Sequence, residues 1–258
     1  MDFIVTTDRI LQDNGDFLSR NGVGFCSKDL HLTPKGNLAV FHGYIYNHIS
    51  LGAKGNSLVT LFEEHNRCIL RNVDGPFALV FFDGRTLFIA RDAYGMQPMF
   101  WGSTQGGLWV SNYQAHARAR PFPLGHFASI DVNDAPADLS LQPVVRWVED
   151  TFHGNLRAAP DYHSLIIKNY LFDAVHKCVV SAQGGPMVLL LSGGLSSSIL
   201  LAVLQMSVAN LPISTLTVAK SDNSLCLKAA RFIADEFQTD HYEIILNDDD
   251  VDKKLLKG

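Results

Sequence analysis

Apolar residues in the first half of this chain occur as short runs separated by turn residues. Phe77–Phe82 is such a run, Asp83-Gly84-Arg85 follows it, and Thr86–Ala90 continues in the same manner. Asp-Gly between two apolar runs is the strongest short-range signal for a β-hairpin. Other runs predict strands at Phe3–Thr6, Leu38–Phe41, Met99–Gly102, Gly107–Ser111 and Leu124–Val132, and a helical spacing predicts one helix at Ser57–Glu64. The pattern therefore predicts a first half made mainly of antiparallel strands.

The second half alternates apolar runs with helical spacings. Val188–Leu191 is continuously apolar, which predicts a strand buried on both faces. Further strands are predicted at Ile213–Ala219 and His241–Leu246. Helical spacing predicts inward faces made of Leu165, Ile166, Tyr170, Leu171, Ala174, Val175 and Cys178 before the first strand, and of Leu227, Ala230, Phe232, Ile233 and Phe237 before the last. Strands that alternate with helices predict a parallel sheet with right-handed crossovers.

A loop of small residues, Ser192–Ser198, joins the strand at Val188–Leu191 to the helical segment Ile199–Leu204. Glycines let backbone N–H groups approach an anion, and the start of a helix supplies unpaired donors and positive dipole. The hydroxyls of Ser192, Ser196, Ser197 and Ser198 add donors. The loop lacks the lysine of a Walker P-loop and the spacing of a dinucleotide fingerprint. It predicts an anion site of another kind, although a plain strand-turn-helix corner also fits.

Composition narrows the class of protein. The 258 residues are 47% hydrophobic and 18% charged, as in ordinary globular proteins, and the net charge of −5 argues against a nucleic-acid partner. No apolar run reaches the length of a membrane span, and the first residues do not resemble a signal peptide. The four cysteines show no metal-like spacing, which is typical of reduced thiols in a cytoplasmic protein.

Five segments in a fixed order resemble those of a known family. His42–His48 resembles the Asn-Gly-Glu-Ile-Tyr-Asn-His element of class II glutamine amidotransferase domains, and Ser192–Ser198 resembles the pyrophosphate loop Ser-Gly-Gly-x-Asp-Ser-Ser of enzymes that adenylate a carboxylate. The other three segments are Gly75–Asp83, Arg91–Phe100 and Phe122–His126. Their order is that of the asparagine synthetase B and β-lactam synthetase family of carbon–nitrogen ligases.

The resemblance implies a fold class for each half. For residues 1–132 it implies an α+β, Ntn-hydrolase-like antiparallel sandwich of the glutamine amidotransferase type. For residues 161–258 it implies the N-terminal part of an asparagine-synthetase-type ATP-binding domain, an α/β parallel sheet like that of adenine-nucleotide alpha hydrolases. Residues 133–160, which contain Pro136 and Pro143, are expected to connect the two.

The first half departs from its family at the residues that carry the chemistry. Asp2 stands where the family has its N-terminal cysteine nucleophile, and His42 stands where it has an oxyanion-hole asparagine. Gly43 keeps its backbone donor, whereas Tyr44 replaces a glutamate and Lys54 lies near the position of a substrate-binding acid. We therefore expect His42 and Gly43 to form a vestigial oxyanion site without glutaminase activity. Cys26 is the alternative thiol nearest in sequence, but it carries no α-amine.

The second half keeps most of the family's nucleotide-binding residues. The resemblance implies that ATP and Mg²⁺ are the cofactors and that the adenine lies beside Leu190 and Val218, although apolar strand residues are more commonly plain core. The phosphates would lie on Ser192, Gly193, Gly194, Ser196, Ser197 and Ser198. Ser196 replaces the family's aspartate, so weak binding is expected. Asp248-Asp249-Asp250 is interpreted as a solvated helix cap rather than a metal site, and the metal ligands remain unknown.

Three functional readings remain open. The chain ends at Gly258, where the family's synthetase domain continues, so we expect the parallel sheet to be incomplete unless a second chain or a homodimer completes it. The first reading is a degenerate asparagine-synthetase-like protein with residual ATP binding at Ser192–Ser198. The second is an active amide ligase of the asparagine-synthetase or β-lactam-synthetase type that another chain completes. The third is a non-catalytic binding or scaffold subunit that docks through the edge near His241–Leu246.

Overall fold

The structure is a computed structural model that describes residues 3–8, 18–52, 58–104, 107–114, 119–134, 142–143, 160–181, 187–207 and 212–246. The chain divides into two compact units, residues 1–154 and residues 155–258. Each unit has a hydrophobic core of its own. None of the helices in the described part of the chain is long and apolar enough to cross a membrane.

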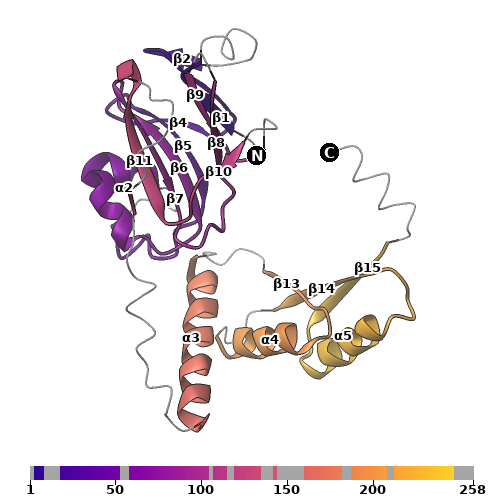
Figure 1. Ribbon diagram of the computed structural model, residues 1–258. Coiled ribbons are helices and arrows are strands. Elements are labelled where there is room, and N and C mark those ends of the chain that lie inside the picture. Colours follow the sequence, from indigo (N-terminus) through magenta and orange to yellow (C-terminus); the bar gives the residue numbers. More distant parts are fainter. Residues whose placement is uncertain are drawn as a thin grey trace. The chain divides into compact units, whose positions relative to one another are not determined.

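The first unit contains two six-stranded sheets (Figure 1). One has the strand order β10-β8-β9-β1-β3-β2, with the bounds Arg120–Pro121, Phe100–Thr104, Gly107–Ser111, Phe3–Thr6, Val23–Ser27 and Leu18–Arg20. The other has the order β12-β11-β7-β6-β5-β4, with the bounds Gln142–Pro143, His126–Asp131, Thr86–Arg91, Phe77–Phe82, Leu38–Gly43 and Leu30–Leu32. Every pairing in both sheets is antiparallel.

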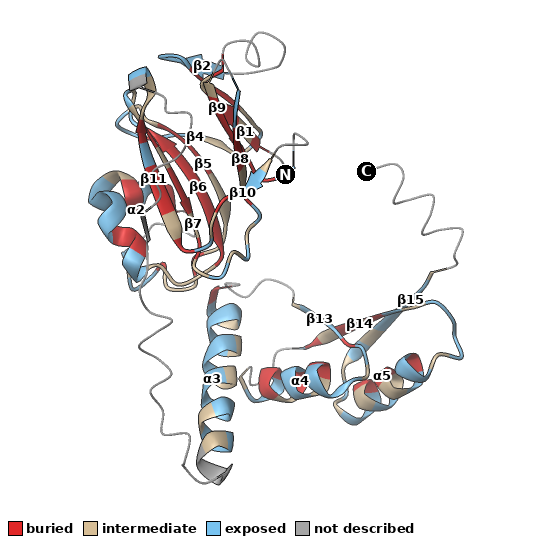
Figure 2. Ribbon diagram, in the orientation of Figure 1, coloured by how far each residue is buried: buried red, intermediate tan, exposed pale blue. Residues whose placement is uncertain are grey.

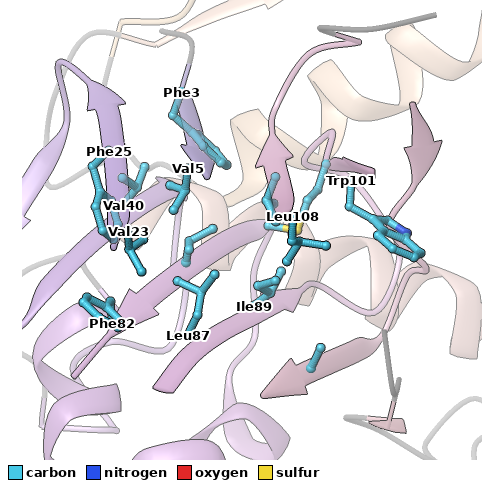
Figure 3. Packing of buried hydrophobic residues seen from close by; sticks show 14 of the residues in the cluster. Phe3, Val5, Val23, Phe25, Val40, Phe82, Leu87, Ile89, Trp101 and Leu108 are labelled. Atoms are coloured by element: carbon cyan, nitrogen blue, oxygen red, sulfur yellow. The ribbon is translucent and has the colours of Figure 1, made fainter. Parts of the chain in front are cut away.

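The two sheets pack face to face around one core (Figure 3). Phe3 and Val5 of β1 contribute from the first sheet, while Val40 of β5 and Ile89 of β7 contribute from the second. Successive side chains of a strand point to opposite faces, so these alternate positions share the inner face. This antiparallel sandwich confirms the α+β class predicted for the first half.

The outer face of the second sheet is covered by the helical segments α2 (Leu58–His65) and η1 (Asn66–Asn72). Leu58 and Phe62 of α2 pack against Leu79 of β6 in a second apolar cluster. Because the sandwich covers one face and these helices cover the other, all six residues of β6 are buried. A continuous apolar run here means a strand covered on both sides.

The second unit is a small α/β layer. Its three strands, β13 (Val188–Leu190), β14 (Ser214–Ala219) and β15 (Asp240–Ile245), are parallel and lie in sequence order. Helix α3 (Pro160–Ser181) precedes them, and α4 (Leu195–Ser207) and α5 (Leu225–Glu236) connect them. Figure 1 shows α4 and α5 along the same side of the sheet. The parallel α/β arrangement predicted for the second half is confirmed.

The prediction that Val188–Leu191 is buried on both faces is wrong. Val188 is 58% exposed and Leu190 is 68% exposed, whereas Leu191 is 1% exposed. Figure 2 shows the same contrast between the sheets of the two units. Among the described elements, α4 and α5 cover one face of this sheet and nothing covers the other, so alternate apolar residues remain in solvent. We call this exposed surface the open face: Val188, Leu190, Val218, Tyr242 and Ile244.

Two of the predicted helical faces also differ from those observed. In α3, Leu165 and Tyr170 are exposed although they were expected to face inward, whereas Val175 packs against the core as expected, together with Val179. In α5, Phe232 is 70% exposed although it was expected to face inward. Helical spacing locates an apolar stripe, but the neighbouring elements decide which part of it is covered.

Candidate functional site

The Ser192–Ser198 loop follows a strand end that is held firmly by its neighbour. Leu191 donates its N–H to the carbonyl of Leu216 at 2.9 Å. The Thr217 hydroxyl, from a side chain that is almost completely buried, donates to the carbonyl of Leu191. Helix α4 then begins at Leu195. The predicted order of strand, loop and helix is confirmed, but the helix begins at Leu195 rather than at Ile199, so residues 195–198 of the predicted loop form its first turn.

The two glycines of the loop have different roles. Gly193 has a φ of +74°, and a Cβ there would lie 2.5 Å from the carbonyl oxygen of Cys226 and 2.8 Å from the amide of Ala230. Only glycine allows this approach to α5. A Cβ on Gly194 would meet only the Ser192 hydroxyl, at 3.4 Å. Gly193 is required by the fold, whereas the surface above Gly194 is open.

The loop presents backbone donors at the start of α4. The first intrahelical bond is Ser198 N–H to the carbonyl of Gly194, at 3.2 Å. Among the described residues, no acceptor is found for the N–H groups of Leu195, Ser196 and Ser197, as expected for the first turn of a helix. These three donors and the positive end of the helix dipole fit a phosphate group.

The serine hydroxyls are less available than the sequence predicts. Ser197 and Ser198 both donate to the carbonyl of Gly194, at 3.1 Å and 2.8 Å. Ser192 lies 3.0 Å from the Ser197 hydroxyl. Ser196 is exposed, and its side chain has no partner in the described part of the chain. Of the four predicted hydroxyl donors, only that of Ser196 is uncommitted.

Leu190 and Val218, the predicted neighbours of an adenine, lie on the open face. Leu190 pairs with Leu216 of β14, and Val218 lies two residues after Leu216 in β14. The side chains of Leu190 and Val218 therefore lie on the same side of the sheet. Val218 is 52% exposed, so the alternative reading of this position as plain core is not supported. An apolar surface beside the loop suits a flat aromatic ring.

Metal ligands are not grouped in the part of the chain that the structure describes, which holds no cluster of three or more His, Cys, Asp or Glu side chains. Asp248-Asp249-Asp250 lies outside the described residues, so its interpretation as a helix cap stays a prediction. The neutral hydroxyl of Ser196 is a poor ligand for a hard cation such as Mg²⁺.

In the first unit, the backbone after β5 is locked by two glycines. Gly43 has a φ of +139°, and a Cβ there would lie 2.1 Å from the carbonyl oxygen of Pro76. A Cβ on Gly75 would likewise lie 2.1 Å from the carbonyl oxygen of Tyr44. Tyr44 N–H donates to the Pro76 carbonyl at 2.8 Å. The two segments therefore pass each other at backbone contact distance.

His42 lies at the end of β5, immediately before this contact. It alternates with Leu38 and Val40, which are part of the sandwich core, so its side chain lies on the inner face of its sheet. Its Nδ1 is buried and has no hydrogen-bond partner among the residues that the structure describes. Asp2 and Lys54, the other altered positions, lie outside the described residues.

Cys26 is not brought to His42. Cys26 pairs with Ile4, whereas the neighbouring Phe25 and Val5 point into the sandwich core. Because directly paired residues share a face, Cys26 and Ile4 point away from that core. The imidazole therefore faces the interior of the sandwich, whereas the thiol faces away from it.

A buried carboxylate that sequence reasoning did not single out organises the turn after β7. Asp92 is almost completely buried and accepts hydrogen bonds from the backbone N–H groups of Phe77, Tyr94, Met96 and Gln97, at 3.0 to 3.3 Å. Arg91 donates to the carbonyls of Gln97, Phe122 and Gly95. Burial lowers the pKa of the Arg91 guanidinium, and the charge of Asp92 opposes that shift. The Arg91-Asp92 pair was the available signal, but its role here is structural.

A polar network also lies beneath α5 in the second unit. Arg231 binds Glu243 through two nitrogens at 2.6 and 2.7 Å, and it binds Asp222 at 2.5 Å. The hydrogen bond from Arg231 is the main reason that the pKa of Glu243 is lowered. The same bonds raise the pKa of Arg231.

Comparison with known proteins finds a matching family model for part of each unit. The model of the glutamine amidotransferase domain family matches residues 30–116, and that of the asparagine synthase family matches residues 167–257. An asparagine synthetase [glutamine-hydrolyzing] of Pongo abelii is 27% identical over 252 residues, which covers 81% of this chain and 44% of the relative. The corresponding protein 1 of Lotus japonicus is 27% identical over 237 residues, covering 81% and 38%. The chain thus spans less than half the length of these relatives.

Solved structures show only distant similarity. Glutamine phosphoribosylpyrophosphate amidotransferase of B. subtilis is 10% identical with a TM-score of 0.42, covering 95% of this chain and 84% of that one. An NH3-dependent NAD synthetase of Campylobacter jejuni is 18% identical with a TM-score of 0.31, covering 36% and 41%. Neither similarity is close enough to transfer chemistry to this chain.

Proposed function

We propose, from the premise that this chain is an asparagine synthetase-like protein, that its second unit binds ATP through the Ser192–Ser198 loop. The phosphates would lie against the first turn of α4 and the adenine against the open face at Leu190 and Val218. The first unit would have no glutaminase activity. The chain is then a degenerate relative of amide-forming ligases that keeps nucleotide binding.

One observation carries the proposal: the N–H groups of Leu195, Ser196 and Ser197 have no acceptor among the described residues. They lie directly after Gly194, and the preceding Gly193 packs against α5 so closely that a Cβ there would clash. An anion would satisfy these donors and the helix dipole together. The loop also lies within the segment that matches the asparagine synthase family.

Magnesium would contribute little to this binding. The pyrophosphate-loop pattern has an aspartate where this chain has Ser196, and a hydroxyl provides no charge to hold the cation against the phosphates. Losing one charge-assisted interaction costs roughly 1.5–3 kcal/mol, or about ten- to a hundredfold in affinity. We therefore expect weak ATP binding that depends little on Mg²⁺.

Calorimetric titration with ATP, with and without Mg²⁺, tests the site. Gly194→Val is the informative variant, because a side chain there meets little of the protein but occupies the surface where a phosphate would lie. It should abolish binding while the chain remains folded. Ser196→Asp should tighten binding and make it depend on Mg²⁺. Tight MgATP binding that neither variant alters would refute the site.

Glutaminase activity can be tested separately through release of glutamate from glutamine. We expect none, because His42 and Tyr44 replace the asparagine and the glutamate of the family's element. Turnover that disappears in Cys26→Ala would show a relocated nucleophile. That result would contradict the outward position of Cys26.

A second candidate is a non-catalytic binding subunit, and the open face favours it. Parallel sheets are usually covered on both faces, and this one exposes Val188, Leu190 and Tyr242. A second copy of the chain would then cover the face. Light scattering over a range of concentrations should show a dimer that Leu190→Glu dissociates. A monomer at all concentrations would remove this candidate.

A further inference from the structure

Strand β15 forms an edge of the parallel sheet, and its outward backbone groups have no partner in the described part of the chain. It pairs with β14 on one side, and no described strand pairs with its other side (Figure 1). The N–H groups of Asp240 and Leu246 donate toward β14, to the carbonyls of Ile213 and Ala219 at 3.2 and 2.8 Å. Bonding direction alternates along a strand, so the even-numbered residues of β15 bond to β14. The outward N–H and carbonyl groups belong to the others: His241, Glu243 and Ile245.

β15 lacks the features with which edge strands commonly avoid pairing. It contains no proline or lysine, and its register with β14 is unbroken over all six positions. The charge at its middle, Glu243, is held by Arg231 of α5 through two nitrogens at 2.6 and 2.7 Å. Tyr242 is 59% exposed and Ile244 is 44% exposed, both on the open face. A regular, apolar edge of this kind favours the addition of another strand.

The strand is complementary to a second copy of itself in one antiparallel register. With a two-fold axis at Glu243, His241 of one copy lies opposite Ile245 of the other, and Glu243 lies opposite its own counterpart. Each of these pairs exchanges both N–H···O bonds, so every outward group of the strand is satisfied. An axis moved by one residue, to Tyr242 or Ile244, would leave one outward residue without a partner inside the other β15.

The side chains fit the same register. On the open face, Tyr242 of one copy would lie opposite Ile244 of the other, and an aromatic residue paired with a β-branched one stabilises a sheet. On the α5 side, the two Glu243 carboxylates would lie opposite each other. Like charges in that position are destabilising, but each carboxylate is paired with Arg231 of its own copy. The polar network beneath α5 thus neutralises the centre of the contact.

We propose that β15 is a self-association edge, through which two copies of the chain join their three-stranded sheets into one continuous sheet. The contact contains no part of the Ser192–Ser198 loop, so the inference does not depend on nucleotide binding. It also differs from a contact over the open face at Leu190, since Leu190 lies in β13 and β14 separates β13 from β15.

Light scattering of the full chain over a range of concentrations measures the association. Ile245→Pro removes an outward N–H but no bond to β14, and proline is tolerated at such a position of an edge strand. We expect its dimer to be at least about tenfold weaker, because hydrogen bonds are lost from both copies. Ile245→Val is the matched control: it keeps the N–H and should remain within about twofold of the parent. Leu190→Glu should leave this dimer intact.

A disulfide experiment tests the register. Opposed residues of a non-hydrogen-bonded antiparallel pair have Cβ atoms close enough for a disulfide. Chains carrying Tyr242→Cys are mixed with chains carrying Ile244→Cys, oxidised mildly, digested and analysed by mass spectrometry. The mixture should contain a cross-link between positions 242 and 244, and neither variant alone should cross-link to itself at the introduced position.

Several results would overturn the inference. One is a parent chain that is monomeric at all concentrations, and another is equal association of the parent and Ile245→Pro. A dimer that Leu190→Glu dissociates and Ile245→Pro does not would assign the contact to the open face. A cross-link between two copies of the same variant would refute the register. If Ile245→Pro does not fold, the cross-link between the two cysteine variants decides, and its absence refutes the proposal.

Discussion

The strands β6 and β13 are both continuous apolar runs, yet their surroundings differ completely. All six residues of β6 are buried, because the opposite sheet covers one face and α2 with η1 covers the other. In β13, Val188 and Leu190 are exposed, because the described helices cover one face only. Similar apolar runs thus contribute differently to the stability of their units. The run in the first unit packs into a core on both of its faces, whereas the run in the second packs into a core on one face only.

The largest effect is expected for Leu79→Ala in β6. Leu79 is fully buried, so removing its side chain leaves a cavity and should cost about 2–5 kcal/mol of unfolding free energy. Urea unfolding monitored by tryptophan fluorescence reports on this unit, since Trp101 and Trp109 are buried in it. Leu32→Ala, at an exposed position of β4, is the matched control and should change little. Equal effects of the two variants would contradict the view that β6 is covered on both faces.

A second pair of variants makes the comparison inside one strand run of the other unit. Leu191 is buried and Leu190 is exposed, so Leu191→Ala should destabilise the unit by about 2–5 kcal/mol and Leu190→Ala by less than about 0.5 kcal/mol. Hydrogen exchange of residues 195–207 measures the stability of this unit. If Leu190→Ala is as costly as Leu191→Ala, the open face is covered in solution.

Polar groups extend the comparison. Asp92, buried in the first unit, accepts four backbone N–H groups, so Asp92→Asn should cost about 1.5–3 kcal/mol by weakening charge-assisted bonds. Asp131→Asn, which alters the exposed pair with Arg85, should have a smaller effect. Fluorescence-monitored urea unfolding again gives both values. A larger loss from Asp131→Asn would contradict the structural role of Asp92.

The smallest effect concerns Glu243 in the second unit. Its pKa is lowered in the folded state, so its pairing with Arg231 stabilises the fold at pH values above 4.5, the ordinary pKa of a glutamate. That stabilisation is lost as the pH falls from 4.5 through the lower pKa of the folded state. Calorimetric melting temperatures of the parent and Glu243→Gln should converge between pH 6 and about pH 3. A constant difference over that range would show that the ion pair does not contribute.

Much of the fold could be predicted because its signals are local. The Asp-Gly hairpin between β6 and β7 and the alternation of strands and helices after Val188 required only neighbouring residues. Strand β3 was missed, since Val23 and Phe25 alternate with the small residues Gly24 and Cys26 over only five positions. The exposure of one face of the parallel sheet was also missed, because whether Leu190 is buried depends on elements that are distant in the sequence.

The candidate site shows the same division. The loop, its glycines and its place before a helix could be predicted from Ser192–Ser198. The hydrogen bonds that occupy the Ser197 hydroxyl could not be predicted, because its bonds to Ser192 exist only once the loop has its shape. The outward position of Cys26 likewise depends on its register with Ile4.

The contact between Gly43 and Gly75 separates the course of the backbone from the chemistry it presents. Neither glycine can gain a side chain, since each would place a Cβ 2.1 Å from a carbonyl oxygen of the other segment. His42 and Tyr44, which flank Gly43, take no part in that steric requirement through their side chains. The side chains at positions 42 and 44 can consequently be substituted while the backbone of this segment keeps its path. An engineer who wished to return asparagine to position 42 and glutamate to position 44 would begin with the backbone already in place.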